Sequence, residues 1–488
     1  MALTRRQFLK RTSLCAAGSF LAPSFFSNPL LRRALADTIG DRYFVVLFLQ
    51  GGNDGLNTVV PAQNMGVLRT AYEAARNPNP SAGGLRLPIG SLLASPSMLD
   101  PNTGEQLGLH PGFAGLKALY DMNKVAIIQG CGYPEYNLSH DVSSRIWETA
   151  DPLGANGFGS GWMGRYLGAN YSSSQIPGVT IGDSIAGELG TNATSVLAIR
   201  RLASFGFPYD DDNSDDNSFR RDAFYNLYQD AVGSPLGVLD YAGNGGTATL
   251  LSSESYPQLD YDYTEDPILN RAAFDQQYDA LDTSTARGLR EIAKVIYGVK
   301  RGVTNVNARF FELSNGGYDT HSDQGADETD GQQYKLHKEV GDALKVFYDD
   351  CADMGVADKL CILIWTEFSR RITQNDNGTD HGSQSPMFVI GGKVNGGVYG
   401  NHPNIDQLAL DDDGNTVYSQ DDTNGFRSTD MRDVYGTIMK NWLNMPAAQV
   451  LSSVLIPDSV PPAQANDYWT NPNLDLAKDG GATPLFSP

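Results

Sequence analysis

Acidic and histidine residues that could share a metal ion follow two apolar runs of the sequence. Asp319 and His321 come just after one run, and on an extended segment two residues with this spacing point the same way. Asp380 and His381 are adjacent in the loop after a second run. Because the chain has only six histidines, the position of two of them beside aspartates and just past predicted strands predicts a metal site.

Ser139 and His140 stand where a helix is predicted to begin. A serine in this position commonly caps the helix. It could instead be a nucleophile, because a helix N-terminus and a nearby cation favour an alkoxide and bind an anionic substrate. His140 could be a metal ligand, a general base or a core histidine, and the residues alone leave these interpretations open.

Two further carboxylates follow predicted strands. Asp54 lies in the glycine-rich segment 50–57, where an aspartate can also be an ordinary turn residue. Glu367 comes directly after the run 361–366. Ligand sites in open α/β sheets lie beyond the carboxyl ends of the strands, so both carboxylates are candidates for the same site.

The elements that must position these residues alternate between strand and helix. Short buried runs predict strands, and longer stretches with helical periodicity lie between them. This alternation predicts one mostly parallel central sheet with helices on both faces. The predicted strands are 43–49, 125–129, 179–182, 308–313, 361–366 and 387–390, and the predicted helices are 112–122, 219–232, 269–297, 335–354 and 431–443.

The region 204–267 interrupts this alternation. It contains the acidic run 210–216 among many Gly and Ser residues, which predicts an insertion with an exposed acidic loop. The run lacks the glycine and the closing glutamate of an EF-hand, so a solvated surface is favoured over a calcium loop. The tail after Pro457 is predicted to be irregular.

The N-terminus has the order of an export signal. Thr4-Arg5-Arg6-Gln7-Phe8-Leu9-Lys10 precedes the apolar stretch 14–26 and the small-residue site 34–36. The paired arginines fit the twin-arginine route, which exports folded proteins. We therefore expect residues 1–36 to be removed, the twin-arginine translocase to be a partner, and a periplasmic or secreted protein without a stable membrane anchor.

The net charge of the chain disfavours some classes of partner. The chain carries −21, and removal of the signal takes away six basic and no acidic residues, which leaves 30 basic and 57 acidic residues and a charge of −27. An acidic surface disfavours nucleic acid as a partner. The remaining cysteines, Cys131, Cys351 and Cys361, can form one disulfide at most, and an unpaired buried trio is the alternative.

Several motifs, in this order, resemble one exported family, called domain of unknown function 1501. That family is in turn similar to the alkaline phosphatase and sulfatase superfamily. Apart from the twin-arginine leader, the motifs are segments 48–57, 109–111, 139–140, 161–167, 317–321, 367–370 and 378–382.

The resemblance implies a single α/β domain over 37–488, alkaline-phosphatase-like, and one or two divalent ions such as Zn, Mn or Ca. It also implies hydrolysis of a small or polymeric anionic phosphate or sulfate ester. Ser139 would be the nucleophile, with His140 beside it. The implied metal ligands are Asp54, Asp319, His321, Glu367, Asp380 and His381.

Two departures from the superfamily pattern leave an alternative. The segment 139–143 lacks the proline that a formylglycine sulfatase requires, and Asp380-His381 comes 13 residues after the strand end instead of directly at it. One metal site could therefore be altered or missing. The alternative function is a non-catalytic periplasmic binding or scaffold protein that keeps the fold and at most one metal.

Overall fold

A central sheet forms the middle of the molecule. The computed structural model describes residues 42–134, 136–152, 160–191, 193–206, 215–266, 271–325, 329–403, 405, 408–410, 416–418, 428–455 and 472–487. The predicted signal 1–36 and most of the acidic run 210–216 therefore lie outside the described residues. In the described part the sheet has the order β13-β5-β12-β9-β1-β8-β6-β7, with β16 beside β5. Its strands are β1 (Tyr43–Gln50), β5 (Val125–Gly132), β6 (Gly178–Thr180), β7 (Val196–Ala198), β8 (Phe310–Gly316), β9 (Leu360–Trp365), β12 (Ser385–Gly391), β13 (Gly397–Tyr399) and β16 (Thr429–Asp430).

The predicted mostly parallel sheet is confirmed. β1 pairs in parallel with β8 on one side and with β9 on the other, and β6 continues the parallel pairing beyond β8. β12 runs antiparallel to both β5 and β9. The carboxyl ends of β1, β8 and β9 therefore meet at one edge of the sheet, where the candidate residues follow.

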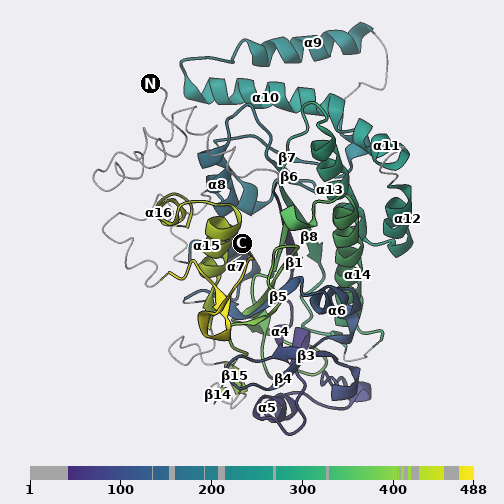
Figure 1. Cartoon of the computed structure of the whole chain (residues 1–488), viewed down its shortest axis with the longest axis vertical. Helices are drawn as coiled ribbons and strands as arrows, with labels where there is room; N and C mark the ends of the chain where they lie inside the picture. Colours follow the sequence, from purple (N-terminus) through teal and green to yellow (C-terminus); the bar gives the residue numbers. More distant parts are fainter. Residues whose placement is uncertain are drawn as a thin grey trace.

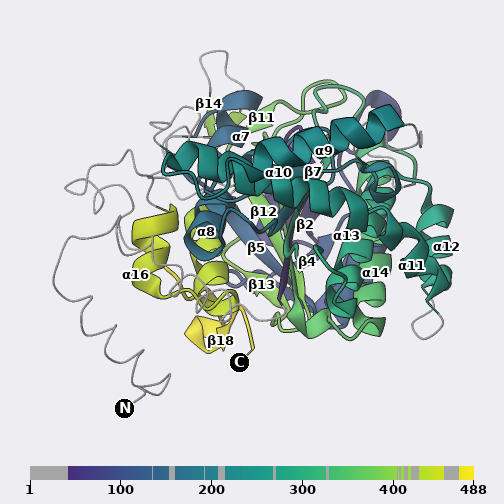
Figure 2. The ribbon, with the colours of Figure 1, turned by 90° about the horizontal axis from the view of Figure 1, so that it is seen from above.

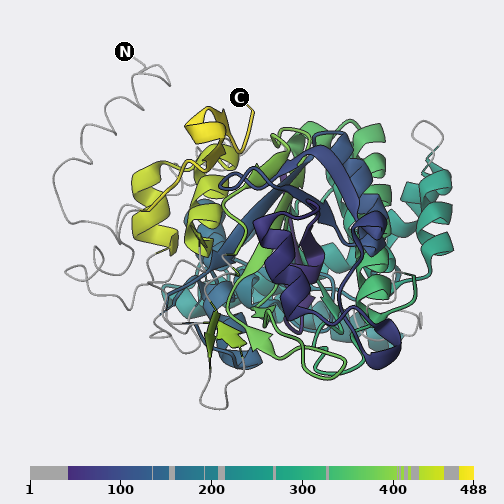
Figure 3. The same cartoon turned by 90° about the horizontal axis from the view of Figure 1, so that it is seen from below.

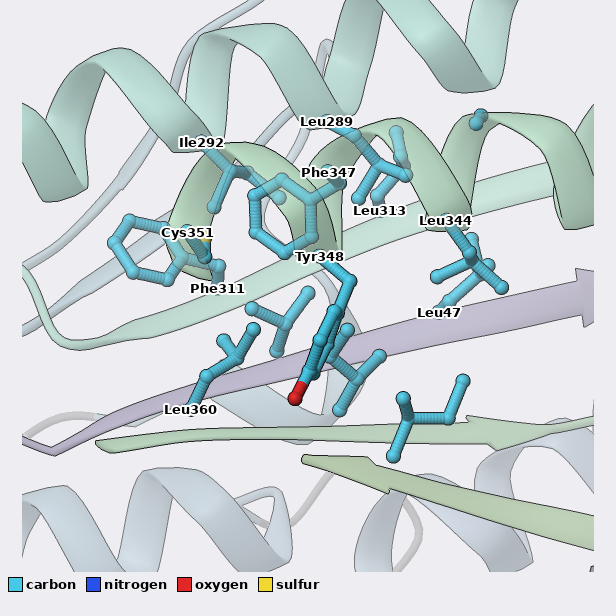
Figure 4. Packing of buried hydrophobic residues seen from close by; sticks show 14 of the residues in the cluster. Leu47, Leu289, Ile292, Phe311, Leu313, Leu344, Phe347, Tyr348, Cys351 and Leu360 are labelled. Atoms are coloured by element: carbon cyan, nitrogen blue, oxygen red, sulfur yellow. The ribbon is translucent and has the colours of Figure 1, made fainter. Parts of the chain in front are cut away.

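Helices cover both faces of the sheet (Figure 1). The fully buried strand β1 supplies both cores, because successive side chains point to opposite faces. Val45 and Leu47 face α6, α13 and α14, whereas Phe44 and Val46 face α7, α8 and α15. Figure 4 shows Leu289 and Ile292 of α13 and Leu344 and Phe347 of α14 packed over Leu47 and Phe311. The helices are α6 (Ala114–Asp121), α7 (His140–Thr149), α8 (Trp162–Asn170), α13 (Ser284–Arg301), α14 (Gln332–Asp353) and α15 (Met431–Thr437).

The two ends of the molecule carry different additions. At the bottom of Figure 1, α4 (Gly55–Thr58) follows β1, and α5 (Val67–Ala75) lies near a small sheet of order β2-β4-β3. The strands of this sheet are β2 (Val59–Pro61), β3 (Leu93–Leu99) and β4 (Gln106–Leu109). Figure 3 shows the same end from below. At the opposite end, α9 (Asp215–Gln229) and α10 (Gly237–Ser255) cross the top of the molecule (Figure 2). The described part of the predicted insertion is therefore helical and lies away from α4.

Several local expectations are refined. The predicted helix 269–297 is two helices, α12 (Ala272–Leu281) and α13, because Asp282 adopts a left-handed conformation and Thr283 caps α13. Cys131, Cys351 and Cys361 are all buried free thiols, so the unpaired trio is the observed arrangement. Among the described residues, no helix is long and apolar enough to cross a membrane.

Candidate metal centre

Four loops at the carboxyl edge of the sheet bring the candidate residues together. Gly51 follows β1, His140 begins α7 after β5, and Asp319 follows β8. Glu367 follows β9, and the chain then forms a small hairpin in which Arg370 pairs with His381. This hairpin returns Asp380-His381 to the strand end. The 13-residue separation seen in the sequence is therefore closed in space.

The carboxylate of Asp319 lies at the centre of the cluster. Its Oδ2 is 3.4 Å from His140 Nε2, and its Oδ1 is 3.3 Å from His321 Nε2 and 3.4 Å from His381 Nε2. The ligand atoms of His140, Asp319 and His381 all lie within 4.8 Å of one another. We refer to Asp319 and these three histidines as the metal cluster.

Each histidine of the metal cluster is held through its other ring nitrogen. His381 Nδ1 is 2.7 Å from the Leu138 carbonyl, which can only accept a hydrogen bond. His140 Nδ1 is 2.8 Å from Glu367 Oε1, and His321 Nδ1 is 2.8 Å from Asp380 Oδ1. An acceptor at Nδ1 favours the tautomer with its proton there and leaves the Nε2 lone pair for a metal ion.

The donor set fits a divalent cation. His321 Nε2 and His381 Nε2 are only 2.9 Å apart, and His381 must carry its proton on Nδ1 when it is neutral. If His321 is held in the same way, two lone pairs face each other. A shared cation or an extra proton removes that repulsion. Imidazole and carboxylate ligands suit Zn or Mn, whereas Ca prefers oxygen ligands.

The protonation states of Asp319 and His381 follow from their surroundings. Burial acts to raise the pKa of Asp319, but the hydrogen bond and charge of Arg370, together with His140 and His381, lower it overall. Burial and the charge of Arg370 lower the pKa of His381 against the opposing effect of the Leu138 carbonyl. Asp319 is therefore ionised and His381 neutral at neutral pH.

Arg370 ties the loops to one another. It is fully buried, and its Nη2 donates to Asp319 Oδ1 at 2.7 Å and to the Tyr318 carbonyl at 3.0 Å. Its Nε donates to the Gly52 carbonyl at 2.7 Å, and its Nη1 to the Thr379 carbonyl at 2.9 Å. Since no part of the guanidinium is exposed, Arg370 positions Asp319 and does not contact a substrate.

Gly51 allows the loops after β1 and β8 to approach closely. Its φ is +122°, and a Cβ atom there would lie 2.4 Å from the backbone nitrogen of Asp319. The Gly51 N–H donates to Glu367 Oε1 at 2.9 Å. A side chain at this position would push Asp319 away from the metal cluster.

Ser139 lies between Leu138, whose carbonyl contacts His381, and His140 of the metal cluster. It is exposed and stands at the N-cap of α7, but its side chain makes no capping hydrogen bond. The register of α7 is fixed because Ser143 and Trp147 both donate to the Glu367 carbonyl. Backbone N–H groups of the first turn of α7 can thus face an anion beside the cluster.

The remaining predicted ligands lie further out. Glu367 and Asp380 contact the Nδ1 atoms of His140 and His321, and their role as metal ligands stays a prediction. Asp54 is 2% exposed, receives Arg76 Nη1 at 2.8 Å and Nη2 at 3.1 Å, and receives Gln324 Nε2 at 2.6 Å. A metal-ligand role for Asp54 stays a prediction, and here a guanidinium neutralises it.

Sequence reasoning missed the residues that support the cluster. The Leu138 carbonyl has no signal in a sequence, because any residue supplies one. Arg76 lies 22 residues from Asp54, and nothing in the spacing pairs them. Arg370 lies only three residues from Glu367 in the sequence, but its burial and its hydrogen bonds to the loop carbonyls are visible only in the structure.

These features define an α/β protein with a histidine- and aspartate-rich cluster at the carboxyl edge of its sheet. Residues 91–421 match the family described as "Protein of unknown function (DUF1501)". The chain belongs to this family, which confirms the resemblance seen in the sequence. No curated protein matches the sequence.

Solved structures of the superfamily that the sequence resembles align with most of the chain. The lipoteichoic acid synthase LtaP from Listeria monocytogenes is 11% identical, with 85% of this chain and 78% of that chain covered and a TM-score of 0.33. The PsFucS1 sulfatase from Pseudoalteromonas sp. is 10% identical, with 86% and 73% covered and a TM-score of 0.33. A protein in the alkaline phosphatase superfamily from Vibrio parahaemolyticus is 12% identical, with 77% and 71% covered and a TM-score of 0.29. At these values the structural similarity is distant.

Proposed function

We propose that the protein is an exported, metal-dependent hydrolase of phosphate or sulfate esters with Ser139 as its nucleophile. The observation that carries this proposal is the metal cluster beside the start of α7. Three imidazole Nε2 atoms converge on one carboxylate, each with an acceptor behind it. An exposed serine stands next to them at a helix N-terminus.

The metal cluster would hold a divalent ion through Asp319, His140, His381 and His321. When bound, such an ion supplies Lewis-acid stabilisation of negative charge and lowers the pKa of a coordinated hydroxyl. The compact group of four residues supports at least one ion. Asp54, a further predicted ligand, is paired with Arg76.

Ser139 and the first turn of α7 would bind and attack the ester. The backbone N–H groups and the helix dipole orient the anionic group. Ser139 Oγ loses its proton and forms a bond to phosphorus or sulfur, while the bond to the alcohol oxygen breaks and the alcohol leaves with a proton. Water then cleaves the serine ester and releases inorganic phosphate or sulfate.

Export forms the second part of the proposal. It rests on the twin-arginine signal in residues 1–36, with the translocase as the transient partner and the periplasm or the exterior as the destination. A protein exported in the folded state can bind its metal before transport. The strong negative charge is compatible with an anionic substrate because a bound ion dominates the local field.

One observation favours the second candidate function, a non-catalytic binding or scaffold protein with at most one metal. The two positively charged side chains that contact predicted site carboxylates, Arg76 and Arg370, are both buried and occupied by the protein itself. Neither can orient an anionic substrate.

The test compares Ser139→Ala with Ser174→Ala, a matched change of another exposed serine. Metal content is measured by inductively coupled plasma mass spectrometry, and hydrolysis is measured with aryl phosphates and aryl sulfates. We expect both variants to keep the metal and only Ser139→Ala to lose activity, by at least about 100-fold. Wild-type activity in Ser139→Ala would overturn the nucleophile. A metal-loaded wild type that cleaves none of these esters would favour the second candidate.

A further inference from the structure

A pocket of about 390 Å³ lies beneath the helix pair α9–α10. In Figures 1 and 2, α10 lies between α9 and the part of the sheet that carries β6 and β7. The pocket is walled by both helices and by the segment 185–196. Its volume falls within the range of small-molecule sites, and it is at the end of the molecule remote from α4 and the metal cluster.

One wall of this pocket is aromatic. The rings of Phe224 and Tyr228 are 4.5 Å apart at 45°, and Tyr241 faces the pocket from α10. Gly246 makes this wall possible, because a Cβ atom there would lie 2.0 Å from the Tyr228 ring. Tyr228 therefore rests directly on the backbone of α10.

Three hydroxyl groups that line the pocket donate their protons to backbone carbonyls. Thr249 donates to the Gly245 carbonyl at 2.8 Å, Tyr241 to the Thr194 carbonyl at 3.1 Å, and Ser195 to the Ser173 carbonyl at 3.2 Å. A hydroxyl that donates its only proton elsewhere offers lone pairs to a ligand. The pocket thus presents fixed acceptors, and no charged side chain is among the described residues that line it.

We propose that this pocket binds a neutral saccharide unit. Sugar hydroxyls donate hydrogen bonds and would pair with the acceptors of Ser195, Tyr241 and Thr249. The C–H face of a pyranose ring packs on an aromatic surface, which Phe224 and Tyr228 supply. The lack of charged lining groups disfavours an ionic ligand, because the charge would be partly desolvated without a partner. This inference goes beyond the proposed hydrolase and does not depend on it.

The experiment measures binding of neutral disaccharides, namely maltose, cellobiose and lactose, to the full chain by isothermal titration calorimetry and saturation-transfer NMR. We expect at least one of them to bind, and Thr249→Val to weaken it by about 5- to 10-fold through loss of one acceptor. Thr264→Val on α11 (Gln258–Glu265) is the matched control, because Thr264 also donates to the carbonyl four residues before it but lies outside the lining. It should bind as the wild type does. Phe224→Ala should weaken binding by about 10-fold.

Three outcomes would overturn the proposal. The first is that none of the three sugars binds at about 50 mM, a concentration at which weak specific ligands are still detected. The second is an equal loss of affinity in Thr249→Val and Thr264→Val. The third is binding of tetramethylammonium in preference to the sugars, which would identify an aromatic cage for cations instead. Metal content and ester hydrolysis, measured on the same variants, report separately on the proposed hydrolase.

Discussion

The metal cluster and a group of three glutamates, which we call the glutamate trio, lie along the same two elements, yet their surroundings favour opposite charge states. α7 begins at His140 of the cluster and ends near Glu148 of the trio. Likewise, β8 contains Glu312 of the trio and leads into Asp319. Glu188 completes the trio, and Glu188 and Glu312 are each 2% exposed.

The surroundings of the trio raise the pKa values of its carboxyls. Burial, together with the charges of Glu312 and Glu148, raises the pKa of Glu188 well above its ordinary value. Burial also raises the pKa of Glu148 and of Glu312 to about 7, with Arg145 opposing the shift at Glu148. Trp365 donates to Glu188 at 3.1 Å, and Ser314 donates to Glu312 at 2.7 Å.

The difference between the two regions lies in their supporting groups. In the metal cluster, Arg370 keeps Asp319 ionised, and acceptors behind the imidazoles turn lone pairs inward. In the trio, burial and neighbouring carboxyls favour protonation, although the hydrogen bonds from Trp365 and Ser314 oppose it. Acidic residues near one another therefore predict a metal site only when cations and acceptors behind them fix their charge state.

The largest expected effect is on metal binding. His381→Ala removes one ligand nitrogen, and Asp319→Asn removes the negative charge of the carboxylate on which the three imidazoles converge. We therefore expect each change to lower metal affinity by more than about 100-fold. Equilibrium dialysis with mass-spectrometric detection measures this. Asp183→Asn, a change of an exposed aspartate, serves as the control and should bind like the wild type. If both cluster variants bind the metal as tightly as the wild type, the metal cluster is not the metal-binding site.

The next effect is on stability and comes from the trio. Between about pH 4.5 and 7 the folded state holds more protons on Glu312 than the unfolded state does, so stability falls as pH rises through this window and then levels off. Glu312→Gln removes this loss and can still accept from Ser314. At pH 8 we expect the variant to be more stable by up to roughly 3 kcal/mol.

Urea unfolding at pH 5 and at pH 8 separates the two contributions. The variant should gain little at pH 5 and most at pH 8. A constant gain at both pH values would mean that packing, and not proton uptake, decides the stability of this region.

The smallest effect concerns the group behind His140. Glu367→Gln keeps the shape of the side chain but removes the negative charge that holds His140 Nδ1. We expect metal affinity to fall by about 10- to 100-fold, with the fold retained. Near-ultraviolet circular dichroism checks the fold, and dialysis checks affinity. A loss as large as that of Asp319→Asn would instead make Glu367 a direct ligand.

Sequence patterns located the carboxyl edge of the sheet correctly. The apolar runs that became β1, β8 and β9 are buried on both faces, and such runs are visible in a single sequence. Since parallel strands end at one edge, Asp319 and Glu367 could be placed near each other. The sequence also predicts that a helix begins at Ser139 and His140.

The contacts that these residues make with distant segments could not be predicted from the sequence. Asp54 has the same local sequence character as Asp319, and only the packing of α5 against the loop brings Arg76 to it. The split of 269–297 into α12 and α13 depends on one left-handed aspartate within a continuous helical period. The side on which each imidazole carries its proton depends on acceptors that come from distant segments.

The hairpin that carries Arg370 and His381 has a consequence for how such proteins are recognised. Because these two residues pair directly across antiparallel strands, the number of residues between them does not by itself set the position of His381. Any intervening length that closes the hairpin delivers the same histidine to the same place. A search that demands a fixed interval between Glu367 and Asp380 would therefore overlook a chain that reaches the same pairing through a hairpin of another length.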